Sequence, residues 1–310
     1  MSTFPRKEKC GVCPRRCEAD RSEQGRLGYC GGGLNIKIAR AALHFWEEPC
    51  ISGTRGSGTI FFSGCPLKCV YCQNHRISHE NYGAEITVDR LRGIFSELQK
   101  KGAHNINLVS PTQYAPLIAE ALSKAKDILN IPVVYNTGGY ETVETIAALD
   151  GLIDIYLPDL KYHDDRYSLK YSKAADYFST AIKAISEMVK QRGKYIIDGN
   201  GMMSGGVMIR HLVIPGLRHD SIKILRSIKE NFGGSVLVSI MGQYTPNEEV
   251  MGIAPLNRRL CTFEYESVCE EARRLGFEGY AQELNSADKA YIPEFNFEGV
   301  FINERTDIRL

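Results

Sequence analysis

Gly-Cys-Pro-Leu-Lys-Cys-Val-Tyr-Cys-Gln-Asn, residues 64–74, is the stretch around which the rest of the sequence is organised. Three cysteines, Cys65, Cys69 and Cys72, are spaced C-x3-C-x2-C within it. Thiolates are soft ligands that favour iron–sulfur clusters or zinc. An iron–sulfur cluster usually takes four cysteines, and no fourth follows nearby. A cluster held by three would keep one iron open, which is typical of a catalytic metal.

Two other interpretations of this loop are a zinc knuckle and three ordinary core cysteines. Zinc would need a fourth ligand, and the three-residue gap is unusual for it. The residue before the third cysteine is Tyr71, whose flat ring could stack on a purine. The spacing therefore favours a cluster beside a nucleoside-binding surface.

This loop, which follows the short apolar stretch 59–62, resembles the cluster loop of the radical S-adenosylmethionine (radical SAM) enzymes. In that family the open iron binds the amino and carboxylate groups of SAM, and an electron from the cluster cleaves SAM to a 5'-deoxyadenosyl radical. The resemblance implies an enzyme with a [4Fe–4S] cluster and SAM. No side chain is then expected to act as the catalyst, because the cofactors supply the difficult chemistry.

Composition limits the classes of protein. The 310 residues include 38 basic and 37 acidic side chains, so the positive surplus typical of nucleic-acid binding is missing. No apolar run is long enough to span a membrane, and the first residues lack the apolar segment of a secretory signal. Ten cysteines in such a chain indicate metal chemistry in a reducing cytoplasm rather than disulfides.

Residues 1–56 differ from the rest and are predicted to form a cysteine-rich N-terminal extension. Cys10, Cys13 and Cys17 are spaced C-x2-C-x3-C, and Cys30 follows. Four soft ligands could hold one zinc ion or a second iron–sulfur cluster, and the sequence does not choose between them. The alternative is four free thiols in a glycine-rich leader. Cys50 stands apart and is predicted to be an ordinary buried cysteine.

From residue 57 apolar segments alternate regularly between strand and helix periods. Strands are predicted at 59–62, 106–109, 132–135, 152–157, 207–214 and 236–240, with a further short strand at 277–281. Helices are predicted near 91–98, with Thr87 as N-cap, and at 114–128, 143–147, 175–190, 221–231 and 263–275. This alternation predicts an α/β fold with a parallel sheet. Six such units fit the partial (β/α)6 TIM barrel that the resemblance implies, with a core at 57–282 and a tail at 283–310.

In parallel α/β barrels the reactive groups lie at the C-terminal ends of the strands, where the loops converge. That rule nominates polar or flexible residues independently of any family. The predicted site residues at these positions are Ser110, Thr112, Asn136, Asp159, Lys161, Arg210 and Met241. Each could also have a structural role, as a turn residue, an ion pair or core packing.

Several strand ends are similar to those of the pyruvate formate-lyase activating enzymes. The shared residues are Asp159-Leu160-Lys161, Ile209-Arg210 and Pro215-Gly216. The resemblance implies that Tyr71 and Met241 hold adenine, that Ser110 and Thr112 face the SAM amino group, and that Asn136, Asp159 and Lys161 face ribose and carboxylate. Arg210 would pair with the carboxylate. The implied substrate is a glycine of a glycyl radical enzyme.

The departures from that pattern matter. Ser110-Pro111-Thr112 replaces the Gly-Gly-Glu that binds the SAM ammonium, and Gln243 stands where those enzymes have histidine. Asn136 replaces an aspartate, so a monovalent cation implied at Asn136 and Asp159 would bind more weakly. The whole chain is more similar to a subgroup of homologues that carries the four-cysteine leader, the His-Phe-Trp-Glu-Glu-Pro of residues 44–49 and Cys-Gln-Asn.

Two further segments have open interpretations, and two single residues are assigned a place. Residues 41–49 contain the sole tryptophan, Trp46. They either line the substrate pocket or pack at the bottom of the barrel, and we expect the packing role. Residues 199–206, with Met202 and Met203, form either a lid or a hairpin-like loop. His211 is expected in the core, and Glu230 on an outer helix.

We therefore predict a cytoplasmic radical SAM enzyme that abstracts hydrogen from a protein or peptide substrate. Its partners would be SAM and an electron donor such as flavodoxin or ferredoxin, with no nucleic acid and no membrane. One rival is a radical SAM reaction on another peptide or a small metabolite. The other is a non-enzymatic metal-binding or electron-transfer protein, since fold and cofactor do not fix the substrate.

Overall fold

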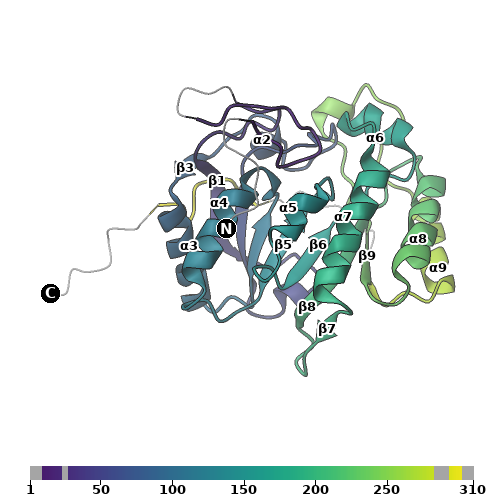
Figure 1. Ribbon diagram of the computed structural model, residues 1–310. Coiled ribbons are helices and arrows are strands. Elements are labelled where there is room, and N and C mark those ends of the chain that lie inside the picture. The colour runs from purple at the N-terminus through teal and green to yellow at the C-terminus, as the bar shows by residue number, and fades with distance from the viewer. Residues whose placement is uncertain (1–8, 23–26, 283–292, 302–310) are drawn as a thin grey trace.

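The computed structural model describes residues 9–22, 27–282 and 293–301. Its centre is a 10-stranded sheet in the order β10-β9-β8-β6-β5-β4-β2-β1-β3, with β7 paired to β8 (Figure 1). The sheet does not close within the described residues, so β10 and β3 are its two ends. The predicted α/β fold with a partial barrel is confirmed.

The parallel part of the sheet matches the predicted strands closely. Each strand pairs in parallel with its neighbour. The strands are β2 (Ser57–Phe62), β4 (Ile106–Val109), β5 (Val133–Thr137), β6 (Ile155–Pro158), β8 (Met203–Leu212), β9 (Leu237–Met241) and β10 (Gly279–Ala281).

Alternate residues of these strands face opposite sides of the sheet. On β5, Val134 packs in a cluster with Ile155 and Met208, whereas Tyr135 packs in the larger cluster beneath the helices. We call the Val134 side the inner face. Asn136 follows Val134 by two residues and lies on that inner face, and Thr137 lies on the outer one.

Helices cover the outer face of the sheet (Figure 1). They are α3 (Val88–Lys100), α4 (Ala115–Ala125), α5 (Val143–Ala147), α6 (Asp165–Ser172), α7 (Tyr177–Arg192), α8 (Arg218–Phe232) and α9 (Thr262–Arg274), and short helices occur at α1 (Pro49–Ser52) and α2 (His75–Ser78). Thr87 caps α3 by accepting from the Arg90 N–H, as predicted. Helix α6 was not predicted, because its buried side includes Ser168 and Ser172 rather than an apolar stripe.

A strand in the predicted extension belongs to the sheet. β1 (Ile36–His44) pairs antiparallel with β2 and with β3 (Ala84–Ile86). The described part of the tail packs along β1, where Ala41 N–H donates to the Glu298 carbonyl oxygen at 2.8 Å. The predictions for 283–292 and 302–310 lie outside the described residues, as do those for 1–8 and 23–26.

The lid interpretation of residues 199–206 is wrong. β7 (Ile196–Ile197) pairs antiparallel with the start of β8, and the turn between them is closed by Asp198. This hairpin projects from the lower end of the sheet, whereas the N-terminal leader lies over the upper end beside α2 (Figure 1). Met203 is buried in the inner cluster, so the methionines are at the wrong end to cover the strand ends.

Three single-residue predictions are confirmed. His211 is buried with Nδ1 2.7 Å from the Leu160 carbonyl oxygen and Nε2 2.8 Å from the Ser221 hydroxyl. Cys50 is buried in the inner cluster, and Glu230 is exposed on α8. No helix in the described ranges is long and apolar enough to cross a membrane.

Candidate functional site

The three-cysteine loop lies between β2 and α2, and each of its sulfurs accepts at least one hydrogen bond. Leu67 N–H lies 3.4 Å from the Cys65 sulfur. The Ser172 hydroxyl donates to Cys69 at 2.9 Å, and the Ser78 hydroxyl donates to Cys72 at 3.3 Å. Hydrogen bonds of this kind stabilise anionic sulfur ligands and tune an iron–sulfur centre.

Burial and mutual repulsion of the cysteines favour the neutral thiols while no positive centre is present. Burial, followed by the neighbouring Cys69 and Cys72, raises the pKa of Cys65 to about 12. Burial also raises the pKa of Cys72. No three Cys, His, Asp or Glu side chains of the described residues surround a single point at ligand distance from one ion. The donor set, three sulfurs each with its own hydrogen bond, fits a polynuclear cluster.

The leader is docked directly on this loop. Cys65 N–H donates to the Cys30 carbonyl oxygen at 3.2 Å. The Arg15 guanidinium donates to the Pro66 carbonyl oxygen at 2.7 Å and to that of Ser172 at 2.8 Å. Arg15 thus joins the leader, the cluster loop and α6, and its guanidinium stacks 4.4 Å above the Tyr29 ring.

The leader cysteines are near enough to influence one another, since Cys10 and Cys17 both act electrostatically on Cys30, but no three of these four described side chains surround a single ion position. Cys10, Cys13 and Cys30 are buried, and Cys17 is half-buried. The Cys30 sulfur accepts from the Gly32 N–H at 3.3 Å and lies 3.7 Å from the Arg21 guanidinium. Burial raises the pKa of Cys13 and of Cys30. Three of the four sulfurs therefore belong to buried residues, and that of Cys30 has an N–H donor of the kind that metal-bound thiolates need.

Arg210 is the centre of a polar network on the inner face. Its Nε donates to Asp159 at 3.1 Å and its Nη2 donates to Asn136 at 2.6 Å. Its Nη1 donates at 3.0 Å to Glu47, which had not been predicted as a site residue. The structure thus brings together three predicted residues from three strands, and all three guanidinium nitrogens are already hydrogen-bonded.

Lys161 completes the network on its other side. Its ammonium lies 2.5 Å from the Asp159 carboxylate. Although burial favours the protonated acid, Lys161 and Arg210 hold the pKa of Asp159 below its usual value. Burial opposes the charge of Lys161, but Asp159 raises the pKa of its ammonium. A monovalent cation at Asn136 and Asp159 would have to compete with these two side chains for the same oxygens.

Thr112 is not where the prediction placed it. Ser110 has a left-handed backbone (φ 57°), after which a short 3-10 helix, Thr112–Tyr114, turns the chain outward. The Thr112 hydroxyl donates to Glu141 at 2.5 Å, beside Thr137 on the outer face. Thr112 therefore does not join Asn136 on the inner face.

Glu141 is a buried acid that sequence reasoning missed. It is 1% exposed, and burial raises its pKa to about 7 despite hydrogen bonds from the Thr112 and Thr137 hydroxyls. Its second oxygen has no hydrogen-bond partner within the described ranges. A lone glutamate after Gly138-Gly139-Tyr140 carried no pattern that distinguished it from a surface loop residue.

Tyr71 and Met241 are both largely buried. The Tyr71 hydroxyl lies 2.6 Å from that of Tyr162, which is 2.8 Å from the Ser172 hydroxyl. Because Ser172 donates to Cys69, this chain of hydroxyls ends at a cluster-loop sulfur. Met241 ends β9 and lines a cavity on the inner face.

The segment 41–49 is the main correction to the predicted site. We expected it to pack at the barrel bottom, but Glu47 reaches the network, where Asn107 donates to it at 3.0 Å. Trp46 is 58% exposed and borders two cavities. The segment connects antiparallel β1 to α1, so strand-end rules for parallel sheets could not place it.

Two cavities share Trp46, Glu47, Arg210 and Gln243 as walls. One, of about 140 Å³, reaches Gln73 and Asn74 behind the last cluster-loop cysteine, and we call it the mouth cavity. The other, of about 230 Å³, extends between Glu48 and strands β9 and β10, and we call it the lateral cavity. The Glu47–Arg210 ion pair therefore lies at the boundary of both.

Comparison with known proteins gives a family match over more than half of the chain. The sequence model of the radical SAM superfamily matches residues 59–228, which include all three cysteines of the loop. An uncharacterised protein of Methanocaldococcus jannaschii is 32% identical over 279 residues, covering 86% of this chain and 75% of that protein. This family implies an enzyme with a [4Fe–4S] cluster and SAM.

Solved structures share the fold at low sequence identity. A radical SAM methyltransferase from Sphaerobacter thermophilus matches with a TM-score of 0.50 and 16% identity, covering 74% of this chain and 69% of that one. Streptococcus suis SuiB bound to its precursor peptide SuiA matches with a TM-score of 0.50 and 15% identity over 72% of this chain. The present chain covers 48% of the SuiB chain, about half of its length.

Proposed function

The chain belongs to the radical SAM superfamily, and from this premise we propose that it cleaves SAM reductively and abstracts a hydrogen atom from a bound substrate. Cys65, Cys69 and Cys72 would hold the [4Fe–4S] cluster. When bound, the cluster and SAM would supply the electron and the 5'-deoxyadenosyl radical. The observation that carries the proposal is that each of the three sulfurs has its own hydrogen-bond donor.

The protein's part is to position SAM at the strand ends. We assign Asn136, Asp159 and Lys161 to the ribose and carboxylate groups, and Arg210 to the carboxylate. Arg210 pairs with Glu47 in this structure. When SAM binds, its carboxylate would take the place of the Glu47 carboxylate on the guanidinium. Such an exchange keeps the guanidinium paired throughout.

The adenine and ammonium ends of SAM need other groups. Tyr71 and Met241 would border the adenine, as their burial near the loop and the cavity suggests. Ser110 remains assigned to the ammonium through its hydroxyl, because a hydroxyl accepts hydrogen bonds. Thr112 is withdrawn from this role because its hydroxyl donates to Glu141 on the outer face.

The substrate has two candidates. Similarity to the pyruvate formate-lyase activating enzymes at Asp159-Leu160-Lys161 and Pro215-Gly216 favours a glycine of a glycyl radical enzyme. The lateral cavity favours the second candidate, a peptide side chain or small metabolite, because a glycine has no side chain to fill about 230 Å³. The reaction class is the same for both.

We also propose that Cys10, Cys13, Cys17 and Cys30 share one metal centre, either an iron–sulfur cluster or zinc. The burial of Cys10, Cys13 and Cys30 and the Gly32 N–H that donates to the Cys30 sulfur support this assignment. An electron donor such as flavodoxin or ferredoxin, in the cytoplasm, would then approach the face that the leader forms. No monovalent cation is included, because Lys161 and Arg210 already pair with Asp159.

The test is anaerobic incubation of the reconstituted full-length protein with SAM and dithionite, followed by measurement of 5'-deoxyadenosine. The parent should form it slowly, and the Cys65→Ala/Cys69→Ala/Cys72→Ala variant should form none and lose about four iron atoms. Cys261→Ala, at an exposed cysteine, is the control and should match the parent. Product formation by the triple variant, or none by a cluster-loaded parent, would overturn the proposal.

A further inference from the structure

We infer that the lateral cavity binds a primary ammonium group of the substrate, and that Glu48 is the side chain that recognises it. The inference rests on the proposed function, because it names the chemical class of the second substrate candidate. The group could belong to a small amine or to a lysine side chain, which share this chemistry.

Glu48 is a buried acid with an unused oxygen. It is 9% exposed and lines the lateral cavity. Its carboxyl hydrogen-bonds to the Ser239 side chain, yet Oε2 has no hydrogen-bond partner among the described residues. A buried polar atom without a partner is costly, so a ligand that donates to it gains more than it would at the surface.

The charges around the cavity select for a cation. Arg210 also borders the cavity, but its three nitrogens already donate to Asp159, Glu47 and Asn136. Arg210 and Lys161 supply two positive charges. When Glu48 is ionised, the carboxylates of Asp159, Glu47 and Glu48 supply three negative charges. One negative charge is therefore left over, and a single ligand cation would balance it, whereas an anion would add to the excess.

Without such a ligand, the Glu48 carboxylate lacks, within the described part of the chain, a cation close enough to compensate for its burial. Burial, only partly offset by Arg210, raises the pKa of its carboxyl. Apart from Glu47 and Arg210, the remaining walls are uncharged, and they include Met241, Gln282 and Tyr280. They suit an aliphatic chain with a polar end.

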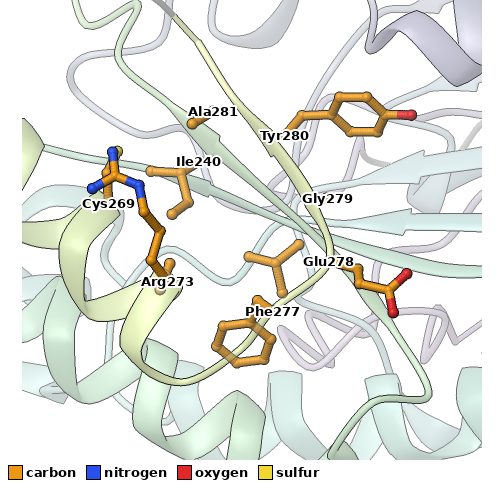
Figure 2. Close-up of a pocket in the computed structure, with 10 residues that line it drawn as sticks. Ile240, Cys269, Arg273, Phe277, Glu278, Gly279, Tyr280 and Ala281 are labelled. Carbon is orange, nitrogen blue, oxygen red and sulfur yellow. The ribbon is translucent and has the colours of Figure 1, made fainter.

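The cavity is placed where a substrate can enter and meet the SAM site. Strand β10 ends the sheet, so this side of the partial barrel is not closed by a further strand in the described part. Figure 2 shows Tyr280 pointing away from Phe277 and Arg273, which line a separate pocket against α9. Tyr280 lines both that pocket and the lateral cavity, and the lateral cavity shares Arg210 with the mouth cavity.

Trp46 makes the inference testable without turnover. It is the chain's sole tryptophan and borders the lateral cavity, so its fluorescence reports on the occupant. The cluster-loaded protein is titrated anaerobically with n-butylammonium, n-butyrate or n-butanol, three probes of equal chain length and different charge. Butylammonium should change the emission saturably, and the other two should not. Equal responses to all three, or no response to butylammonium, would overturn the inference.

Variants then test Glu48 itself. Glu48→Gln should weaken butylammonium binding about tenfold or more, whereas Glu48→Asp, which keeps the charge, should retain the preference over butyrate. Glu270→Gln is the matched control, the same change at an exposed glutamate on α9. Unfolding midpoints of all variants show whether they remain folded. Unchanged binding in a folded Glu48→Gln variant would remove Glu48 from the site.

Two further measurements are needed. One distinguishes a peptide lysine from a free amine as the source of the ammonium group, and the other distinguishes failure of this inference from failure of the proposed function. Nα-acetyllysine methylamide that binds more tightly than butylammonium would assign the group to a peptide lysine, and weaker binding would assign it to a free amine. SAM cleavage by the same preparation tests the proposed function independently. Cleavage without ammonium binding would overturn only the present inference, and binding without cleavage would overturn only the proposed function.

Discussion

The backbone N–H of Cys65 donates to the carbonyl oxygen of Cys30 at 3.2 Å. One cysteine belongs to the three-cysteine loop and the other to the leader, so the two cysteine groups are in direct contact through the main chain. Arg15 strengthens the connection by donating to the Pro66 carbonyl oxygen at 2.7 Å. A change in the conformation of the leader should therefore alter the conformation of the 64–74 loop.

The first prediction concerns the metal of the leader. Replacing Cys10, Cys13, Cys17 and Cys30 together by alanine should remove one metal centre while the cluster of the 64–74 loop is retained in lower yield. The lower yield follows because the metal would hold the leader in place, and the leader presents the Cys30 carbonyl oxygen that accepts from the Cys65 N–H. Iron, zinc and acid-labile sulfide measured on full-length protein will show which metal is lost. Metal content equal to that of the parent would contradict the assignment.

The second prediction concerns the hydroxyl of Ser172, which donates to the Cys69 sulfur at 2.9 Å. A donor to sulfur stabilises the more negative, reduced cluster, so Ser172→Ala should lower the reduction potential. If the hydrogen bond favours the reduced form by about 1 kcal/mol, the potential falls by roughly 40 mV. Redox titration followed by electron paramagnetic resonance measures this shift.

The matched control for Ser172 is Ser186→Ala on α7. Ser186 donates to the Ile182 carbonyl oxygen within its own helix and is exposed. It should leave the potential unchanged. An equal potential in Ser172→Ala and Ser186→Ala would show that the Cys69 contact does not tune the cluster.

Residues at the strand ends were predictable because parallel strands bring their carboxyl ends to one edge. Asn136, Asp159 and Arg210 come from three different strands, and the structure joins all three through the Arg210 guanidinium. The C-x3-C-x2-C spacing likewise needed no tertiary information. Both signals are local or follow directly from the strand–helix alternation.

Side chains whose position depends on the whole fold were not predictable. Glu47 and Glu48 lie in a connection after an antiparallel strand, where Glu47 reaches Arg210 and Glu48 lines the lateral cavity. Thr112 was misplaced because the left-handed turn at Ser110 sends the chain outward. Neither event leaves a periodic pattern in the sequence.

The third prediction concerns Arg210, whose removal would leave Asp159 and Glu47 without their shared partner. Arg210→Ala should lower the free energy of unfolding by about 3–5 kcal/mol, the usual cost of breaking a buried ion pair. It should also weaken SAM binding by about 1.5–3 kcal/mol if one charged hydrogen bond is lost. Urea unfolding and anaerobic SAM titration measure the two effects.

Arg210→Lys and Glu230→Ala give the comparison for these measurements. The lysine keeps the charge but not the three-way geometry, so it should fall between parent and alanine in both assays. Glu230 is exposed on α8 and should have no effect. Parent-like SAM affinity in Arg210→Ala would remove Arg210 from the SAM site, whatever its effect on stability.

The last prediction concerns Glu141, whose pKa burial raises from 4.5 to about 7. Between these values the unfolded chain loses this proton while the folded protein keeps it, so rising pH lowers stability through this window. The fall should be roughly 3 kcal/mol, complete above pH 7. Glu141→Gln, which keeps acceptors for Thr112 and Thr137, should abolish it, whereas Glu144→Gln at an exposed position on α5 should not. The free energy of unfolding is measured by urea titration from about pH 5 to 8. If it changes with pH in the same way for the parent and for Glu141→Gln, Glu141 is ionised in the folded protein throughout this range.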